Sequence, residues 1–260
     1  GLRPGDHAGW FSAWRDLGER TLDTARAADE DGHRVSAAGA FLRGSAYLGV
    51  AVNALSALDR ADELAATFTR QRQAWDAFVD RAPVPVERVA IPYADITLPG
   101  CVFRPANTVD SPSAMLVAVN GSDGALAGLW ATCVSPALER GYTVLVFDGP
   151  GQQSMLFERD VPFRPDWEKV LTPVLDAVVA RPEVDGDRVA VYGVSQAGYW
   201  VTRALAFEHR PVAAVVDPGV VDVATSWERE IPGSLLKLLD KGEDHAFDRD
   251  MEIGMRLNPA

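Results

Sequence analysis

The sequence predicts an α/β fold: a doubly wound, mostly parallel sheet preceded by an N-terminal helical domain. Short β-branched runs alternate with longer segments of helical composition between residues 114 and 216, which is typical of parallel strands joined by crossover helices. Each run is apolar over about five residues, as expected of a strand that is covered on both faces. Residues 1–82 differ, because they are rich in Ala, Arg, Glu and Leu and carry apolar residues at helical spacing.

Three amphipathic helices are expected in residues 1–82, with a break near residues 31–33 and an end at the Pro83-Val-Pro85 linker. The residues at helical spacing are Trp10, Trp14, Leu17 and Leu22, then Phe41, Tyr47, Val50 and Leu55, and finally Leu64, Phe68 and Trp75. Two interpretations stay open: the helices form a bundle that stabilises the sheet domain, or they form a cap that closes a catalytic cleft.

The strands of the sheet are expected in a definite order along the chain. Segments 86–91 and 96–103 form an antiparallel pair, and the parallel strands follow at 114–119, 143–147, 189–192 and 212–216, joined by helices within 125–140, 165–181 and 196–208. We therefore expect a core domain over residues 83–224. Residues 225–260 read as an amphipathic helical lid segment with no further strand.

The segment around Ser195 is the strongest chemical signal. An apolar strand runs into Gly193-x-Ser195 and then into a helix-forming segment, which is the setting of a nucleophile elbow that holds a serine hydroxyl exposed. The glycine leaves room for the tight turn, and a small residue two positions after the serine lets helix and strand approach. Here that residue is Ala197, followed by Gly198, so the strict G-x-S-x-G pattern is not met.

Three segments, 120–124 (Asn-Gly-Ser-Asp-Gly), 148–154 (Asp-Gly-Pro-Gly-Gln-Gln-Ser) and 193–198, resemble the α/β-hydrolase superfamily. The chain is most similar to the branch with an N-terminal helical domain, which includes 2,6-dihydroxypseudooxynicotine hydrolase, fungal hydrolases that shorten polyketide pigments, and fermentation/respiration-switch-type esterases. It departs from this branch at Gln153, where a glycine is often found.

This resemblance implies a serine hydrolase that cleaves an ester or a carbon–carbon bond beside a ketone. Ser195 would be the nucleophile, and the backbone N–H groups of Ser122 and Gln196 would form the oxyanion hole. Gly121, Asp148 and Glu228 are further candidates for the pocket, Glu228 because an extra acidic group follows the fourth strand in the resembling C–C hydrolases. Alternatively, segment 120–122 is an ordinary strand-ending turn, and Asp148 shapes the turn beside the site.

The base and acid that should activate Ser195 are not recognisable. In this superfamily they follow the nucleophile in the order Asp or Glu, then His, after two further strands, whereas the sequence after Asp222 looks helical. Three explanations stay open. The His and Asp belong to a further segment or chain, and the C-terminal strands are missing here; His245 acts with Asp217 or Asp222; or the domain is a non-catalytic ligand-binding or interaction module.

Composition and net charge limit the classes of binding partner that we expect. A net charge of -12 disfavours nucleic acids and anionic membranes, and neither a run of about 18 apolar residues nor a signal pattern occurs, so we expect a cytoplasmic protein. The expected partner is a small-molecule ester or ketone, with a homodimer as a further expectation. No H-x-x-H-type cluster suggests a metal or other cofactor. Cys101 and Cys133 lack C-x-x-C spacing and are expected to be buried and reduced.

Overall fold

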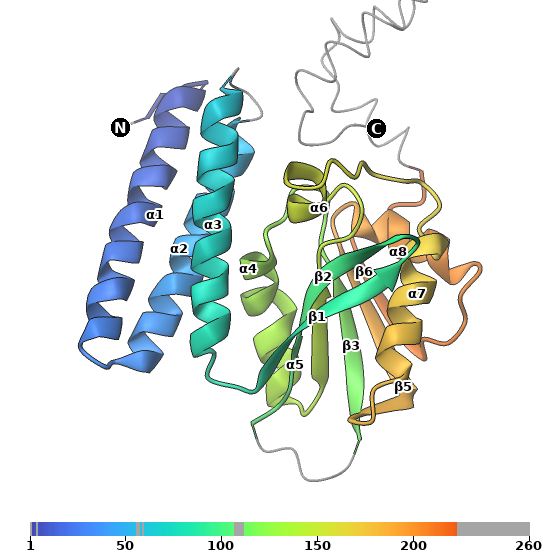
Figure 1. Ribbon diagram of the computed structural model, residues 1–260. Helices are drawn as coiled ribbons and strands as arrows, with labels where there is room; N and C mark the ends of the chain where they lie inside the picture. Colours follow the sequence, from blue (N-terminus) through green and yellow to red (C-terminus); the bar gives the residue numbers. More distant parts are fainter. Residues whose placement is uncertain (1, 4, 56–57, 59, 107–111, 223–260) are drawn as a thin grey trace, which may run out of the picture.

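The structure is a computed structural model that describes residues 2–3, 5–55, 58, 60–106 and 112–222. Three N-terminal helices stand beside a six-stranded sheet that has helices on both faces (Figure 1). This arrangement confirms the predicted α/β class with an N-terminal helical region. The expected lid segment, 225–260, lies outside the described residues, and the division into domains stays a prediction.

The three N-terminal helices match the expected ones. They are α1 (His7–Glu30), α2 (Arg34–Ala54) and α3 (Ala61–Arg81). Helix α1 begins where the Asp6 carboxylate accepts a hydrogen bond from the Gly9 N–H at 2.8 Å, which satisfies a donor at the start of the helix. Helix α2 is long and apolar enough to pass for a membrane span by length and composition, but half of its apolar window is buried. This burial fits the central helix of a bundle.

The sheet has the strand order β1-β2-β4-β3-β5-β6. Its strands are β1 (Val86–Tyr93), β2 (Ile96–Phe103), β3 (Ser113–Val119), β4 (Thr143–Phe147), β5 (Val184–Val194) and β6 (Ala213–Asp217). Strands β1 and β2 pair antiparallel, β2 joins β4 antiparallel, and all other pairings are parallel. The predicted sequence of one antiparallel pair followed by parallel strands is confirmed.

Strand β6 corrects one expectation. Its apolar composition predicts a strand that is covered on both faces, yet four of its five residues are exposed, Val215 at 57%. Among the described residues, β6 is the last strand in the sheet order and pairs only with β5.

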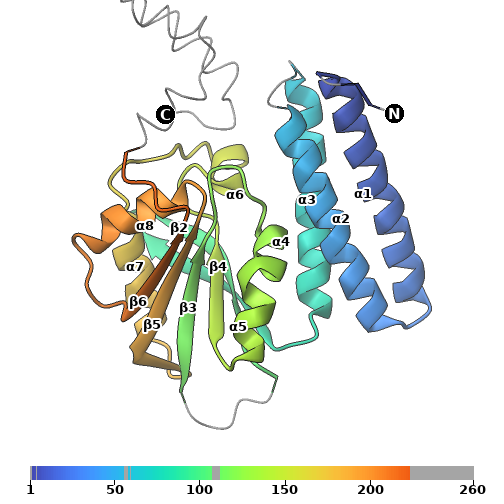
Figure 2. The same cartoon turned by 180° about the vertical axis from the view of Figure 1, so that it is seen from behind.

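Helices cover the two faces of the sheet unequally. Helices α4 (Leu126–Leu129) and α5 (Ser135–Glu139), joined by a π-helical turn at Trp130–Val134, lie on the face toward the N-terminal bundle. Helices α7 (Glu168–Val179) and α8 (Ala197–Leu205) lie on the opposite face (Figure 2). The short helix α6 (Gln153–Phe157), which follows β4, is not expected from the sequence.

The N-terminal bundle and the sheet share one hydrophobic core. Trp75 and Phe78 of α3 belong to the same buried cluster as Phe103 of β2 and the helices that follow β3. The ring centroids of Phe78 and Trp130 are 4.8 Å apart, and those of Trp75 and Phe103 are 6.2 Å apart. Aromatic pairs at these distances add to the area that they bury. The bundle is therefore packed onto the sheet through aromatic side chains.

Candidate active site

Ser195 lies at the turn between β5 and α8, as the sequence predicts. It has a left-handed φ of 57°, which is uncommon for a residue with a side chain, and it is exposed. A Cβ atom on Gly193 would lie 2.6 Å from the carbonyl oxygen of Ala197, so only glycine fits this turn. The chain thus accepts local backbone strain and presents the serine hydroxyl at the carboxyl end of the sheet.

The segment after β6 packs directly against this turn. The Ser195 N–H donates a hydrogen bond of 2.6 Å to the carbonyl oxygen of Asp217, the last residue of β6. A Cβ atom on Gly198 would lie only 1.8 Å from the carbonyl oxygen of Pro218. Gly198 is therefore the small residue that lets the segment after β6 approach helix α8 closely. Ala197, in contrast, has its side chain fully buried.

The loop after β3 lies against the nucleophile. A Cβ atom on Gly121 would be 2.9 Å from the Ser195 Cβ and 3.3 Å from its Oγ. The buried Asn120 side chain shapes this loop, because its Oδ1 accepts from the Gly121 N–H at 2.9 Å and its Nδ2 donates to the Ala125 carbonyl at 3.0 Å. The two loops that the sequence singles out therefore meet at Ser195.

Two backbone N–H groups of these segments have no hydrogen-bond acceptor among the described residues. Within the part of the chain that the structure describes, neither the Ser122 N–H nor the Gln196 N–H donates a hydrogen bond to a protein atom. The Gly121 N–H, in contrast, is already bonded to Asn120. Ser122 and Gln196 are the residues that the sequence predicts as oxyanion donors.

The loop after β4 is hydrogen-bonded to the loop after β3. Gln152, which is 1% exposed, donates from Nε2 to the carbonyl oxygens of Asn120 at 2.7 Å and Gly121 at 2.9 Å, while its Oε1 accepts from the Gly149 N–H at 2.7 Å. Gln153 donates from Nε2 to the Asp123 carbonyl at 3.1 Å and has a φ of 33°. A left-handed φ is adopted most readily by glycine, the residue that the resemblance leads us to expect at this position.

Asp148 is a structural anchor in this loop. Its carboxylate is 2% exposed and accepts hydrogen bonds from the Ser154 hydroxyl at 2.6 Å and from the guanidinium of Arg72, on α3, at 2.9 Å. Burial alone lowers the pKa of Arg72, but the charges of nearby carboxylates, Asp148 first, outweigh burial and raise the pKa overall. These contacts with Ser154 and Arg72 are in line with a role of Asp148 in shaping the turn.

Comparison with known proteins finds similar hydrolases. Hydrolase LUC6 of a Fusarium species is 32% identical over 229 residues, which cover 85% of this chain and 54% of LUC6. The 20-hydroxy-prefusarin hydrolase FUS2 of Gibberella moniliformis is 33% identical, with the same shares covered. The crystal structure of 2,6-dihydroxy-pseudo-oxynicotine hydrolase superimposes with a TM-score of 0.76 at 22% identity, covering 87% of this chain and 62% of that one. The chain belongs to the α/β-hydrolase superfamily.

The superfamily assignment rests on these relatives, since no protein-family model matches the sequence. The chain spans 54% of the length of both curated relatives. The turn at Ser195 and the loop at Asn120 lie where this superfamily places the nucleophile elbow and the loop of the second oxyanion donor, and these roles are proposals for this chain. The activity and substrate of the whole protein are therefore matters of proposal.

The structure brings some of the predicted site residues together and leaves others untested. Gly121 packs against Ser195, and Ser122 and Gln196 directly follow these two residues in the chain. Asp148 lies in the neighbouring loop after β4, whereas Glu228 and His245 are outside the described residues. No hydrogen bond joins Ser195 Oγ to a histidine in the part of the chain that is described. The location of the catalytic base therefore stays a prediction.

Acidic groups near the elbow have other partners. Asp217 accepts from the Tyr192 hydroxyl at 3.5 Å, the long limit of a hydrogen bond. Burial, followed by the charge of Asp217, raises the pKa of Tyr192, so this phenol stays protonated at neutral pH. Asp222 has an interaction partner of its own.

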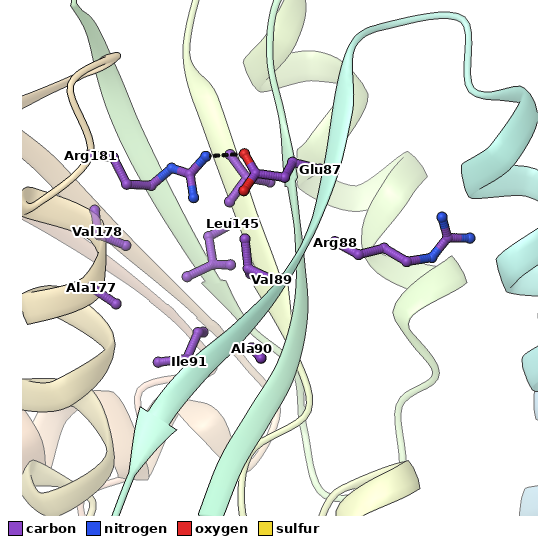
Figure 3. Close-up of a pocket in the computed structure, with 10 residues that line it drawn as sticks. Glu87, Arg88, Val89, Ala90, Ile91, Leu145, Ala177, Val178 and Arg181 are labelled. Carbon is purple, nitrogen blue, oxygen red and sulfur yellow. Dashed lines mark hydrogen bonds and ion pairs between the residues drawn. The ribbon is translucent and has the colours of Figure 1, made fainter.

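Two pockets in the structure are separate from Ser195. One, of about 270 Å³, lies between β1 and α7 and is lined by residues that include Val89 and Val178. Figure 3 shows the lining residues and the ion pair between Arg181 and Glu87. A second, of about 280 Å³, lies among the three N-terminal helices. Among the described residues, no group of three or more His, Cys, Asp and Glu side chains is placed to hold a metal ion. Cys101 and Cys133 are buried and free, as expected.

Proposed function

We propose that the protein containing this chain is a serine hydrolase with Ser195 as its nucleophile. One observation carries the proposal: an exposed serine at φ 57° packs against the loop after β3, and the N–H groups of Ser122 in that loop and of Gln196 after the serine have no acceptor among the described residues. A hydroxyl in this position can attack a carbonyl carbon, and the two N–H groups can bind the oxyanion that forms. Relatives named as hydrolases support this chemistry.

In the proposed mechanism, Ser195 Oγ adds to the substrate carbonyl while a histidine takes its proton, and the tetrahedral oxyanion is held by the Ser122 and Gln196 N–H groups. Collapse of the intermediate expels an alcohol from an ester, or an enolate from a ketone-activated carbon–carbon bond, and the histidine returns the proton to the leaving group. Water then cleaves the acyl-enzyme in the same way. The histidine and its acid are proposed to lie outside the described residues.

The substrate class is an ester or a ketone with an adjacent scissile carbon–carbon bond. The names of FUS2 and of the structural relative each specify one organic compound, 20-hydroxy-prefusarin and 2,6-dihydroxy-pseudo-oxynicotine, which supports a small-molecule substrate. Glu228 is proposed to assist carbon–carbon cleavage. Gln substitution of Glu228 should then impair hydrolysis of a 1,3-diketone more than hydrolysis of a p-nitrophenyl ester.

Labelling with a fluorophosphonate probe tests the nucleophile. In the full-length protein we expect a covalent adduct on Ser195, identified by peptide mass spectrometry, and none in Ser195→Ala. The same substitution should lower kcat for an activated ester by about a million-fold, as for other serine triads. Ser154→Ala is the matched control, because Ser154 is buried beside Asp148 and should not react. An unlabelled Ser195 would favour a non-catalytic binding module on the same fold.

A further inference from the structure

The side chain of Gln152 is fixed between two loops of the site. It is 1% exposed, and its amide makes three hydrogen bonds: Oε1 accepts from Gly149, and Nε2 donates to the carbonyls of Asn120 and Gly121. The backbone closes the same turn, because the Gln152 N–H donates to the Gly149 carbonyl at 3.0 Å. A fully bonded, buried amide of this kind has one orientation.

The Gly121 carbonyl belongs to the same peptide group as the Ser122 N–H. A peptide group is planar and trans, so its C=O and N–H point in opposite directions. A hydrogen bond that holds the Gly121 carbonyl toward Gln152 therefore turns the Ser122 N–H to the other side of the loop. The preceding peptide group is held at both ends, its carbonyl by Gln152 and its N–H by the Asn120 side chain.

Glycine 121 makes this control necessary. A glycine lacks the Cβ atom that restricts rotation of the neighbouring peptide planes, so the Gly121–Ser122 peptide has little orientation of its own. At the same time Gly121 packs directly against Ser195. A small rotation of this peptide would move the Ser122 N–H away from the position of an oxyanion.

We propose that Gln152 is a positioning residue for the oxyanion hole, which fixes the Ser122 N–H in its donating orientation through the Gly121 carbonyl. The proposal rests on the proposed function. Gln152 itself does not touch the substrate. Its effect should be confined to the tetrahedral state, because a substrate carbonyl gains less from these donors than a full oxyanion does.

The test removes the hydrogen-bond donor of Gln152 and keeps a side chain of similar size and shape. In the full-length protein, Gln152→Glu replaces the NH₂ group that faces two carbonyl oxygens by an oxygen, and Gln152→Met removes the donor. Both should lower kcat for a p-nitrophenyl ester by about 100-fold and change KM by less than about threefold, as expected for loss of one oxyanion donor. The inhibition constant of a trifluoromethyl ketone, which forms a tetrahedral adduct with serine, should rise in proportion to the loss in kcat/KM.

The pH profile separates this role from a structural one. Burial favours the neutral form of a carboxyl group, whose single O–H can still donate to one carbonyl. The kcat of Gln152→Glu relative to wild type should therefore rise at acidic pH, whereas that of Gln152→Met should not. The matched control is Gln71→Glu, a buried glutamine that is 2% exposed and donates to Ser45 Oγ at 3.3 Å within the N-terminal helices. It should leave ester turnover unchanged.

Rates are normalised to the sites that a fluorophosphonate titrates, so that misfolded protein does not count as slow enzyme. Wild-type normalised kcat and inhibitor affinity in both Gln152 variants would overturn the positioning role and leave the proposed function intact. A loss that Gln71→Glu shares equally would also overturn it. Absence of labelling in the wild-type protein would instead overturn the proposed function itself.

Discussion

The ion pair between Arg72 and Asp148 is expected to be a major contribution to stability. Its side chains are 20% and 2% exposed. Removing one partner of a buried pair leaves an uncompensated charge and typically costs about 3–5 kcal/mol. Asp148 is the more buried partner, so Arg72→Met, which leaves the carboxylate unpaired, should cost about 4–5 kcal/mol. Asp148→Asn leaves a partly solvated guanidinium and should cost about 3 kcal/mol.

Equilibrium urea unfolding, followed by the fluorescence of the seven tryptophans, measures these costs. The matched control is Asp23→Asn in the exposed pair with Arg26, where the aspartate side chain is 73% exposed and a change within about 0.5 kcal/mol is expected. The double variant of Arg72 and Asp148 should lose less stability than the sum of the single variants, by about 2 kcal/mol or more. Single variants within about 1 kcal/mol of wild type, or an additive double variant, would refute the reasoning.

Two further predictions concern the elbow and a buried carboxylate. Gly198→Ala should displace the segment after β6 and lower both the melting temperature and fluorophosphonate labelling, because the added Cβ would lie 1.8 Å from the Pro218 carbonyl oxygen. Gly128→Ala, on helix α4 with no atom within 4 Å of the added Cβ, should instead be neutral or stabilising by up to about 1 kcal/mol. Hydrogen bonding from Arg210 lowers the pKa of the buried Glu208 to about 2 against the opposing effect of burial. The ionised Glu208 stabilises the fold fully above the pKa of the unfolded chain, near 4.5, and this stabilisation is lost as pH falls through about 2. In urea unfolding, Glu208→Gln should therefore cost about 3 kcal/mol at pH 7 and less at pH 3. A cost that stays constant with pH would contradict this prediction.

The features that could be predicted from the sequence are those that local pattern determines. Helical spacing gave the three N-terminal helices, β-branched runs gave the strands, and a glycine two residues before Ser195 indicated the elbow. Each of these signals lies within one element, so it needs no knowledge of how the chain is folded. The assignment of Ser122 and Gln196 as oxyanion donors follows from the resemblance to the α/β-hydrolases and stays a prediction.

The features that were missed depend on contacts between distant parts of the sequence. Gln152 lies 31 positions from Gly121, and Arg72 lies 76 positions from Asp148, so no local pattern marks either pair. A glutamine in a Gly- and Pro-rich turn looks solvated until the structure shows that it is buried.

The shared aromatic core of the bundle and the sheet limits how the N-terminal helices can move. Swinging them away as a rigid lid would bring Trp75, Phe78 and Phe103 into water together, and burial of each large aromatic side chain is worth about 2–3 kcal/mol. Substrate entry by such a hinge is therefore costly. Chimeras that graft this helical region onto a related enzyme must transplant Phe103 and Trp130 with it, or the graft will dock against a mismatched surface.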